Sequence, residues 1–308
     1  MVKVPVIDFA PFTQGGRKEQ QEVVTKISEA CQEIGFFYLK NYGVSPEMLD
    51  RLRHQSRHFF DLPPEVKNKL ARSTQTNCGY VGIQTERLNP NNPGDLKEAF
   101  NVGLGNLDPR LDPRLDTLPE LEEFQQIVSQ FYQLTTQVIA PQILRAFALG
   151  LDMPLNFFDD QHGENYFLRL LHYPPITQPP EPGQLRAGAH SDYGSITLLW
   201  QDEIGGLEVL TQHGEWLAVP YQADTLVVNV GDAMQHWTNN CRRSTKHRVI
   251  IPLDTKMDIS RYSIALFCDP NPEIELACLE TCCSPDNPPS YRPQLMRDFL
   301  AQRLNATY

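Results

Sequence analysis

Between residues 165 and 267 the chain is a succession of short β-rich segments, and this pattern limits the fold more than any other feature. Separated by Gly, Asp, Asn and Pro, the segments read NYFLRLLHY, ITLLW, GLEVL, WLAVP, TLVVNVG, HRVII and YSIALF. Many short strands at this spacing are typical of a β-sandwich or jelly roll. We therefore expect the second half of the chain to build a β core.

The first half is dominated by helical patterns. Apolar residues at helical spacing and typical start and stop residues predict helices over residues 17–34, 45–60 and 119–150, with a kink at Pro141 in the last. Residues 73–117 are rich in Asn, Pro, Gly and Asp, which predicts long loops containing short elements.

Two further segments complete the outline. FFYLKN, after Gly35, is expected as a buried strand, and residues 291–304 as a closing helix. We find no internal repeat and no low-complexity linker, so the pattern predicts one globular domain over residues 1–308.

Charge and composition exclude several classes of function. A formal net charge of −11 argues against nucleic acid or an anionic membrane as the main partner. No apolar run approaches the roughly 20 residues that span a bilayer, and none near the N-terminus resembles a signal peptide. The 7 cysteines form no CxxC pair, which is typical of reduced thiols. We expect a cytoplasmic protein that acts on a small molecule; its oligomeric state stays open.

The segment RAGAHSDYGSITLL places His190 and Asp192 two positions apart on an expected strand. Residues i and i+2 of a strand point to the same face, so both side chains could bind one metal ion. His236 and His247 are the candidates for a third ligand. We favour His247 because it opens the strand HRVII and would be held rigidly, whereas His236 lies in an expected loop. Two imidazoles and one carboxylate suit Fe(II) in a facial triad.

A second motif is the pair Arg261 and Ser263, which alternation places on one face of a later strand. An arginine fork beside a hydroxyl is a carboxylate clamp. The neighbouring SIALF is apolar, so the strand should be buried, and a buried arginine requires an anion.

Together these residues resemble the Fe(II)/2-oxoglutarate-dependent oxygenases, in the branch that includes isopenicillin N synthase and the plant flavonoid and gibberellin oxidases. The resemblance covers nearly the whole chain. It is carried first by VPVIDFAPF, ACQEIGFFYLKNYGV and DLKEAF, and then, in the family's order, by LHYPP, HSDYG, IGGLEVL, VVNVGD, STKHRV and RYSIALFCDPN.

The resemblance implies roles for individual residues. The iron ligands would be His190, Asp192 and His247, while Arg261, Ser263 and Tyr173 would bind the distal carboxylate of 2-oxoglutarate. Fe(II), 2-oxoglutarate as cosubstrate and O2 are implied, and ascorbate as a possible stimulant. No further catalytic residue is implied beyond the iron ligands.

The implied fold is α+β with a mainly β core: a double-stranded β-helix (jelly roll, cupin-like) with flanking helices and a helical N-terminal region. Residues 1–150 would form the N-terminal α/β region, residues 151–290 the jelly-roll catalytic core and residues 291–308 the C-terminal helix.

Two departures from the family pattern stand out. The interval between His247 and Arg261 is longer than in the plant members, so the loop PLDTKMDIS is expected to be extended. Many plant members also carry an asparagine where this chain has Leu171, which leaves the pose of the cosubstrate less defined.

The implied reaction consumes 2-oxoglutarate and O2, releases succinate and CO2, and hydroxylates a small molecule, with desaturation or cyclisation as variants. One alternative is an oxidase of the same fold that does not use 2-oxoglutarate, such as isopenicillin N synthase or the ethylene-forming type. A more remote one is a non-catalytic cupin-like binding module. A zinc hydrolase could use the same three ligands but has no use for the Arg261–Ser263 pair.

Overall fold

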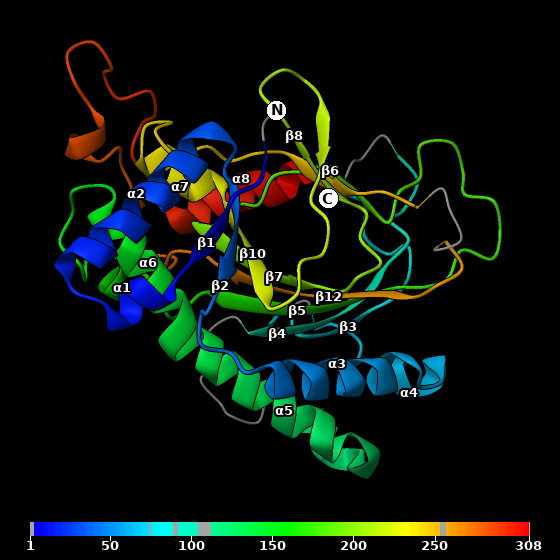
Figure 1. The fold of residues 1–308 in the computed structure, drawn as a ribbon. Helices are drawn as coiled ribbons and strands as arrows, with labels where there is room; N and C mark the ends of the chain where they lie inside the picture. The colour runs from blue at the N-terminus through cyan, green and yellow to red at the C-terminus, as the bar shows by residue number, and fades with distance from the viewer. Residues whose placement is uncertain (1–2, 74, 89–91, 104–111, 253–256, 308) are drawn as a thin grey trace.

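The computed structural model describes residues 3–73, 75–88, 92–103, 112–252 and 257–307 (Figure 1). Its largest element is an eight-stranded mixed sheet. The strands of this sheet are β1 (Val6–Asp8), β2 (Phe36–Lys40), β3 (Gly79–Val81), β4 (Glu98–Gly103), β5 (Tyr166–Tyr173), β7 (Ile196–Gln201), β10 (Thr225–Val230) and β12 (Arg261–Cys268). They lie in the order β1-β2-β10-β7-β12-β5-β4-β3. The expected β core is confirmed.

A smaller sheet faces the large one. It has the order β6-β11-β8-β9, with β6 (Ala187–His190), β8 (Leu207–Leu210), β9 (Trp216–Ala218) and β11 (His247–Val249). A separate ladder joins β13 (Glu275–Leu276) to β14 (Gln294–Leu295). Side chains of both main sheets meet in one apolar cluster, which includes Tyr173, Ala187, Val209 and Ala265. The interior of the sandwich is therefore lined by every second residue of the strands.

The helices lie outside the sandwich: most cover the outer face of the large sheet, and the last two pack beside the β13–β14 ladder. They are α1 (Ala10–Gln14), α2 (Arg17–Glu33), α3 (Pro46–Phe60), α4 (Pro64–Lys69), α5 (Glu122–Leu134), α6 (Ala140–Leu149), α7 (Asp232–Trp237) and α8 (Met296–Thr307). On β12, Ile264 and Leu266 pack with residues of α2, α3, α5 and α6, whereas Ala265 points into the sandwich. In Figure 1, α3 and α5 lie beneath the large sheet, and β6 and β8 lie on its opposite side.

The N-terminal half is part of the β core as well as its helical cover. The FFYLK segment forms β2, which pairs with β1 on one side and with β10 on the other. Gly35, just before it, has φ of 73°, and a Cβ there would lie 2.1 Å from the Arg243 carbonyl oxygen. A glycine is therefore required where the chain turns from α2 into β2.

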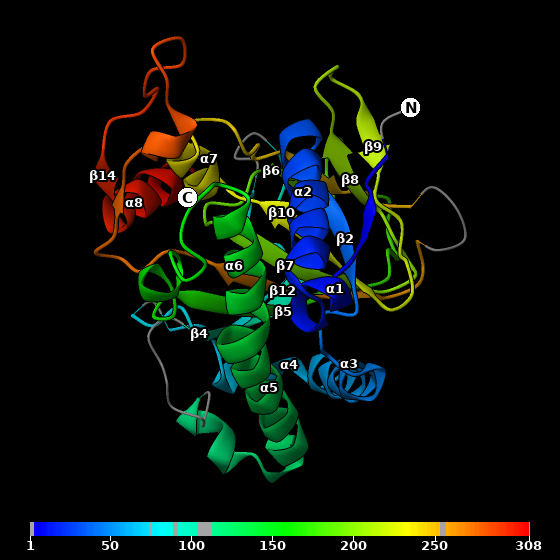
Figure 2. The same ribbon diagram turned by 60° about the vertical axis from the view of Figure 1, so that its left-hand side comes forward.

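The predicted helix boundaries in this half are largely confirmed. Ser45 caps α3 by accepting a hydrogen bond from the Met48 amide at 3.2 Å. The helix predicted over residues 119–150 is interrupted close to Pro141, where a kink was expected. A π-helical segment, Thr135–Ile139, separates α5 from α6, and Pro141 lies in the first turn of α6. Figure 2 shows α5 and α6 as one long column beside α2.

The start of the closing helix and the loop around His236 were predicted wrongly. The closing helix begins at Met296, because Gln294 and Leu295 use their backbone groups in the ladder with β13. The expected loop around His236 forms α7, whose first amide, that of Asp232, donates to the carbonyl of Asp192 at 2.8 Å.

The loop PLDTKMDIS falls partly on residues 253–256, outside the described residues. Within the described part of the chain, none of the helices has the length and apolar character needed to cross a bilayer.

Candidate metal centre and cosubstrate pocket

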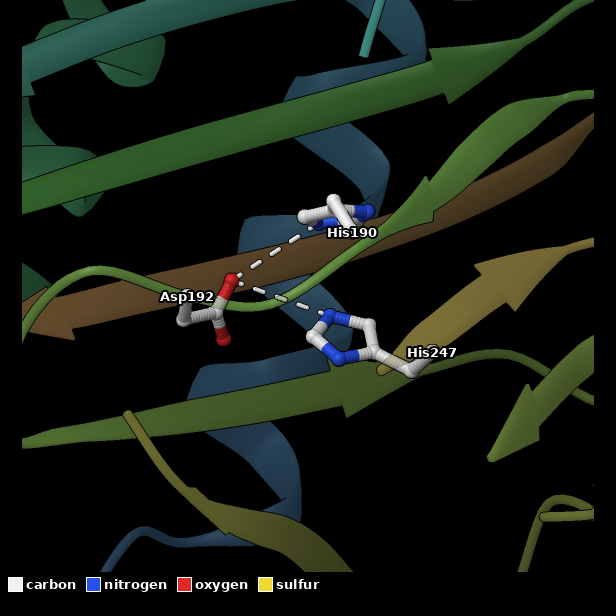
Figure 3. A group of neighbouring side chains, drawn as sticks. All are labelled: His190, Asp192 and His247. Carbon is white, nitrogen blue, oxygen red and sulfur yellow. Dashed lines mark ion pairs between the residues drawn. The ribbon is translucent and has the colours of Figure 1, made fainter. Parts of the chain in front are cut away.

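Three side chains from two strands and a following loop converge at one end of the sandwich (Figure 3). His190 ends β6 and His247 begins β11, and the antiparallel pairing of these strands places the two residues directly opposite each other. Asp192 lies two residues beyond β6, so the expectation that it shares a strand with His190 was wrong. Its Oδ1 atom nevertheless lies 3.7 Å from Nε2 of each histidine.

The backbone sets the tautomer of both histidines. His190 Nδ1 is 2.8 Å from the Gly188 carbonyl oxygen, and His247 Nδ1 is 3.2 Å from that of Thr245. A carbonyl oxygen can only accept, so each Nδ1 carries a proton, and the tautomer of the neutral ring presents the Nε2 lone pair. Both lone-pair atoms face Asp192.

Two polar side chains hold the Asp192 carboxylate. Its Oδ2 atom accepts from Thr197 Oγ1 at 2.6 Å and from Asn229 Nδ2 at 2.7 Å, which leaves Oδ1 to face the histidines. Burial alone would raise the pKa of Asp192. The attraction of His247 and His190 in their protonated forms, together with these two hydrogen bonds, outweighs burial and holds the pKa of Asp192 below the ordinary value.

His190 is neutral at physiological pH. Burial, followed by the charge of His247, lowers the pKa of His190 to about 4. A metal ligand must present a neutral imidazole, so this environment favours ligation.

The three residues fit a metal ion. Their candidate ligand atoms all lie within 4.8 Å of one another. Among the described residues, this is the one group of three histidine, cysteine or carboxylate side chains close enough to share a metal ion. An ion with bonds of about 2.1 Å can span donors up to roughly 4.2 Å apart, so the 3.7 Å separations are suitable. Two imidazoles and one carboxylate form a facial-triad-like set, the donor set of non-haem Fe(II) oxygenases.

The Arg261 side chain is buried, and its hydrogen bonds among the described residues go to uncharged acceptors. Nε donates to the Gly205 carbonyl at 2.8 Å, Nη1 to Ser263 Oγ at 3.2 Å and Nη2 to Gln201 Oε1 at 3.2 Å. A guanidinium has five N–H donors, so one N–H on each terminal nitrogen is left over. Tyr173, the cross-strand neighbour of Arg261, lies against its guanidinium.

The other candidate ligand from the sequence lies elsewhere. His236 is on α7, where its ring stacks on Tyr291 at a centroid distance of 4.5 Å and packs against Phe299. It is not part of the group formed by His190, Asp192 and His247.

Sequence reasoning did not identify Thr197 and Asn229 as the residues that hold Asp192. Asn229 carried a usable signal, because it is the one amide side chain inside the apolar strand TLVVNV. A buried polar residue in such a strand needs a partner, and here the partner is Asp192.

Comparison with family models gives two matches along the chain. Residues 4–127 match the model described as "non-haem dioxygenase in morphine synthesis N-terminal", and residues 164–270 match "2OG-Fe(II) oxygenase superfamily". The second match contains all six residues to which the resemblance gives a role.

Individual relatives match over nearly their whole length. The 2-oxoglutarate-Fe(II) type oxidoreductase hxnY of Emericella nidulans is 32% identical, over 99% of this chain and 90% of that protein. Proline hydroxylase buaE of Petromyces alliaceus is 33% identical, over 100% of this chain and 100% of that protein. Among solved structures, a full-length Neurospora crassa protein in complex with alpha-KG and thymine superposes with a TM-score of 0.89. It is 32% identical, over 99% of this chain and 97% of that chain.

These relationships extend over both halves of the molecule and agree with the facial-triad-like group at its core. The chain belongs to the 2OG-Fe(II) oxygenase superfamily and is an Fe(II)- and 2-oxoglutarate-dependent oxygenase.

Proposed function

We propose that His190, Asp192 and His247 hold Fe(II) while Arg261 and Ser263 bind the distal carboxylate of 2-oxoglutarate. The observation that carries this proposal is the approach of both histidine Nε2 atoms to the free oxygen of Asp192, at 3.7 Å each. Three ligands on one side of an ion leave about three positions open for the keto acid and O2. Bound Fe(II) supplies the oxidative chemistry, in which 2-oxoglutarate is converted to succinate and CO2 as the substrate is hydroxylated.

The chain's own residues position the reactants. Arg261 offers one unused N–H on each terminal nitrogen, which suits a carboxylate bound through both of its oxygens. Ser263 lies beside this fork and can add its hydroxyl. We propose that Tyr173 contributes a further hydroxyl to the same carboxylate, because it faces Arg261 across the strand pair.

The substrate is a small molecule that binds next to the iron site. Support comes from Phe267, an aromatic residue on the same face of β12 as Arg261 and Ser263, which pairs with Thr197, the residue that donates to Asp192. The relatives do not define the molecule, since one is named a proline hydroxylase and another was solved with thymine. Hydroxylation is the proposed outcome, with desaturation or cyclisation as variants of the same hydrogen removal.

The test is O2-dependent release of succinate from 2-oxoglutarate, measured with Fe(II)-loaded protein against a panel of small metabolites. Succinate should form in proportion to product with the true substrate, and parallel assays with and without ascorbate would show whether it stimulates turnover. Product formation with O2 consumption but without succinate would instead identify the oxidase that does not use 2-oxoglutarate. A protein that binds Fe(II) and a small molecule but consumes no O2 would be a binding module.

A further inference from the structure

Arg186 is a buried cation whose hydrogen-bonding capacity is mostly unused. Its side chain has no exposed surface, and its Nη2 atom donates to the Ile259 carbonyl at 3.0 Å. Its Nε and Nη1 atoms are buried and have no hydrogen-bond partner among the described residues. Leaving charged donors unpaired in an interior is costly, so this arrangement indicates that a ligand completes the site.

Like Arg261, the other buried cations of the described structure hydrogen-bond through their charged ends, whereas the Nε and Nη1 atoms of Arg186 have no partner there. Lys67 binds Glu98 at 2.9 Å, and Lys97 binds Asp95 at 2.6 Å. Arg242, also buried, donates to the Gly150 carbonyl and to the Ser28 hydroxyl.

The position of Arg186 is next to the proposed cosubstrate clamp. Its Nη2 contact, Ile259, lies two residues before Arg261. The following residue, Ala187, packs in the same apolar cluster as Tyr173. The backbone around it is held firmly, since the Leu185 carbonyl accepts from the Leu96 amide at 3.0 Å.

The charged groups around Arg186 carry a net positive charge. Burial, followed by the positive charge of Arg261, lowers the pKa of Arg186, while Tyr173 and Asp202 act in the opposite direction. Two guanidinium groups therefore influence each other in the interior, with the Asp202 carboxylate as the opposing charge. One more carboxylate would neutralise the net positive charge of Arg186, Arg261 and Asp202.

We propose that Arg186 is a second guanidinium that binds the distal carboxylate of 2-oxoglutarate together with Arg261. This inference rests on the proposed function. The unused Nε and Nη1 donors of Arg186 and the unused terminal N–H groups of Arg261 then converge on one anion, and each guanidinium offsets the desolvation of that carboxylate.

The test compares two ligands that differ only at the distal group. 2-Oxopentanoate carries a methyl group where 2-oxoglutarate carries its distal carboxylate. Both are titrated calorimetrically into anaerobic, Fe(II)-loaded wild type and Arg186→Met protein. The variant should bind 2-oxoglutarate roughly ten- to a hundredfold more weakly, because it loses charged hydrogen bonds, and should bind 2-oxopentanoate as the wild type does. Arg186→Lys should lie between the two for 2-oxoglutarate.

A second measurement separates binding from a purely structural role. In metal-free, ligand-free protein, Arg186→Met should unfold at the same Tm as wild type or higher, because an unpaired buried charge is removed. The matched control Arg242→Met removes a buried guanidinium whose two terminal nitrogens both donate hydrogen bonds, to Cys241, Ser28 and Gly150, and should lower Tm. Added 2-oxoglutarate should raise the Tm of the wild type more than that of Arg186→Met.

Two results would overturn the inference. One is equal weakening of both ligands in Arg186→Met together with a Tm loss like that of Arg242→Met, which would assign Arg186 a structural role. The other is unchanged affinity for 2-oxoglutarate. If the wild type itself binds no 2-oxoglutarate, the proposed function fails first, and that result is distinct from the other two.

Discussion

Arg261 and Tyr173 are direct cross-strand partners in the antiparallel pair of β12 and β5, and the Arg261 Cζ atom lies 4.6 Å from the centroid of the Tyr173 ring. An aromatic face at this distance attracts a guanidinium and restricts its orientation. The proposed clamp is thereby oriented before any anion arrives, and the Arg261 Nε atom donates a hydrogen bond to the Gly205 carbonyl. The affinity for 2-oxoglutarate should therefore depend on both residues, for different reasons.

Loss of the guanidinium should weaken cosubstrate binding most. Removing one partner of a buried arginine–carboxylate contact costs about 3–5 kcal/mol, so Arg261→Ala should weaken 2-oxoglutarate binding on the order of a hundredfold or more. Arg261→Lys keeps the charge but loses the fork and should show a smaller loss. Ser263→Ala removes one hydrogen bond to a charged group and should cost roughly 1.5–3 kcal/mol. Calorimetric titration into anaerobic, iron-loaded protein measures all three.

Iron binding serves as the internal control for these variants. None of the substituted side chains belongs to the group around Asp192, so Fe(II) affinity should remain that of wild type. A parallel loss of Fe(II) and 2-oxoglutarate binding in Arg261→Ala would contradict its assignment to the clamp.

Substitutions of Tyr173 separate its ring from its hydroxyl. Tyr173→Leu removes the aromatic face beneath Arg261, whereas Tyr173→Phe keeps it. If the hydroxyl binds the distal carboxylate, Tyr173→Phe should lose about 1.5–3 kcal/mol of 2-oxoglutarate binding, and Tyr173→Leu should lose more. Equal affinity in Tyr173→Phe and wild type would limit the role of Tyr173 to packing against the guanidinium.

Each of the three proposed ligands should be essential for turnover. His190→Ala, Asp192→Ala and His247→Ala should abolish succinate release and weaken Fe(II) binding in titrations of the purified variants, because an incomplete donor set holds the ion poorly. His236→Gln is the matched control, since His236 is a buried histidine that stacks on Tyr291, outside the group. Full activity of His247→Ala with loss in His236→Gln would show that the third ligand was misassigned.

The residues that orient Asp192 should matter almost as much as the ligands. Thr197→Val and Asn229→Leu each remove a hydrogen bond to Asp192 Oδ2. Loss of such supports typically weakens metal binding roughly 10- to 100-fold. Thr135→Val is a suitable control, because the Thr135 hydroxyl is buried but bonds only within its own helix, to Phe131 and Tyr132. Fe(II) titration should separate the two site variants from this control.

His162 should make folding stability depend on pH. Burial lowers the pKa of His162 to about 4, and its ring lies between the Phe158 carbonyl and the Ser195 hydroxyl. The folded pKa is below the unfolded value of about 6.5, so this contribution is complete above pH 6.5 and is lost as pH falls toward 4. At pH 5 the protonation of His162 alone should lower the free energy of unfolding by about 2 kcal/mol.

Urea unfolding at pH 7 and pH 5 measures this effect. His162→Gln cannot be protonated, so its free energy of unfolding should fall less between the two pH values than that of wild type. Other titrating groups are common to both proteins and cancel in the comparison. Equal losses in the two proteins would show that the ring of His162 is not held neutral in the folded state.

Much of the architecture could be predicted because its signals are local. The alternation in YSIALF requires only that neighbouring side chains point to opposite faces, and it correctly grouped Arg261 with Ser263 on one face of β12. Ser45 and Pro141 likewise act within one or two helical turns, so their effects on α3 and α6 were visible in the sequence. The elements that were wrong, such as α7 and the start of α8, depend on contacts with distant segments, the loop of Asp192 and β13.

The sequence by itself determined the chemical inventory of this protein: an HxD pair, a distant histidine, an arginine–serine pair and the family to which they belong. Only the tertiary structure decided which of these groups meet. His247 lies with His190 because β11 pairs with β6 in one register, and His236 lies elsewhere because α7 turns it toward Tyr291. The contacts of Thr197 and Asn229 with Asp192, and the lack of partners for two donor atoms of Arg186 among the described residues, were likewise decided by the tertiary structure. The partners and the burial of such side chains arise from chain segments that local periodicity cannot bring together.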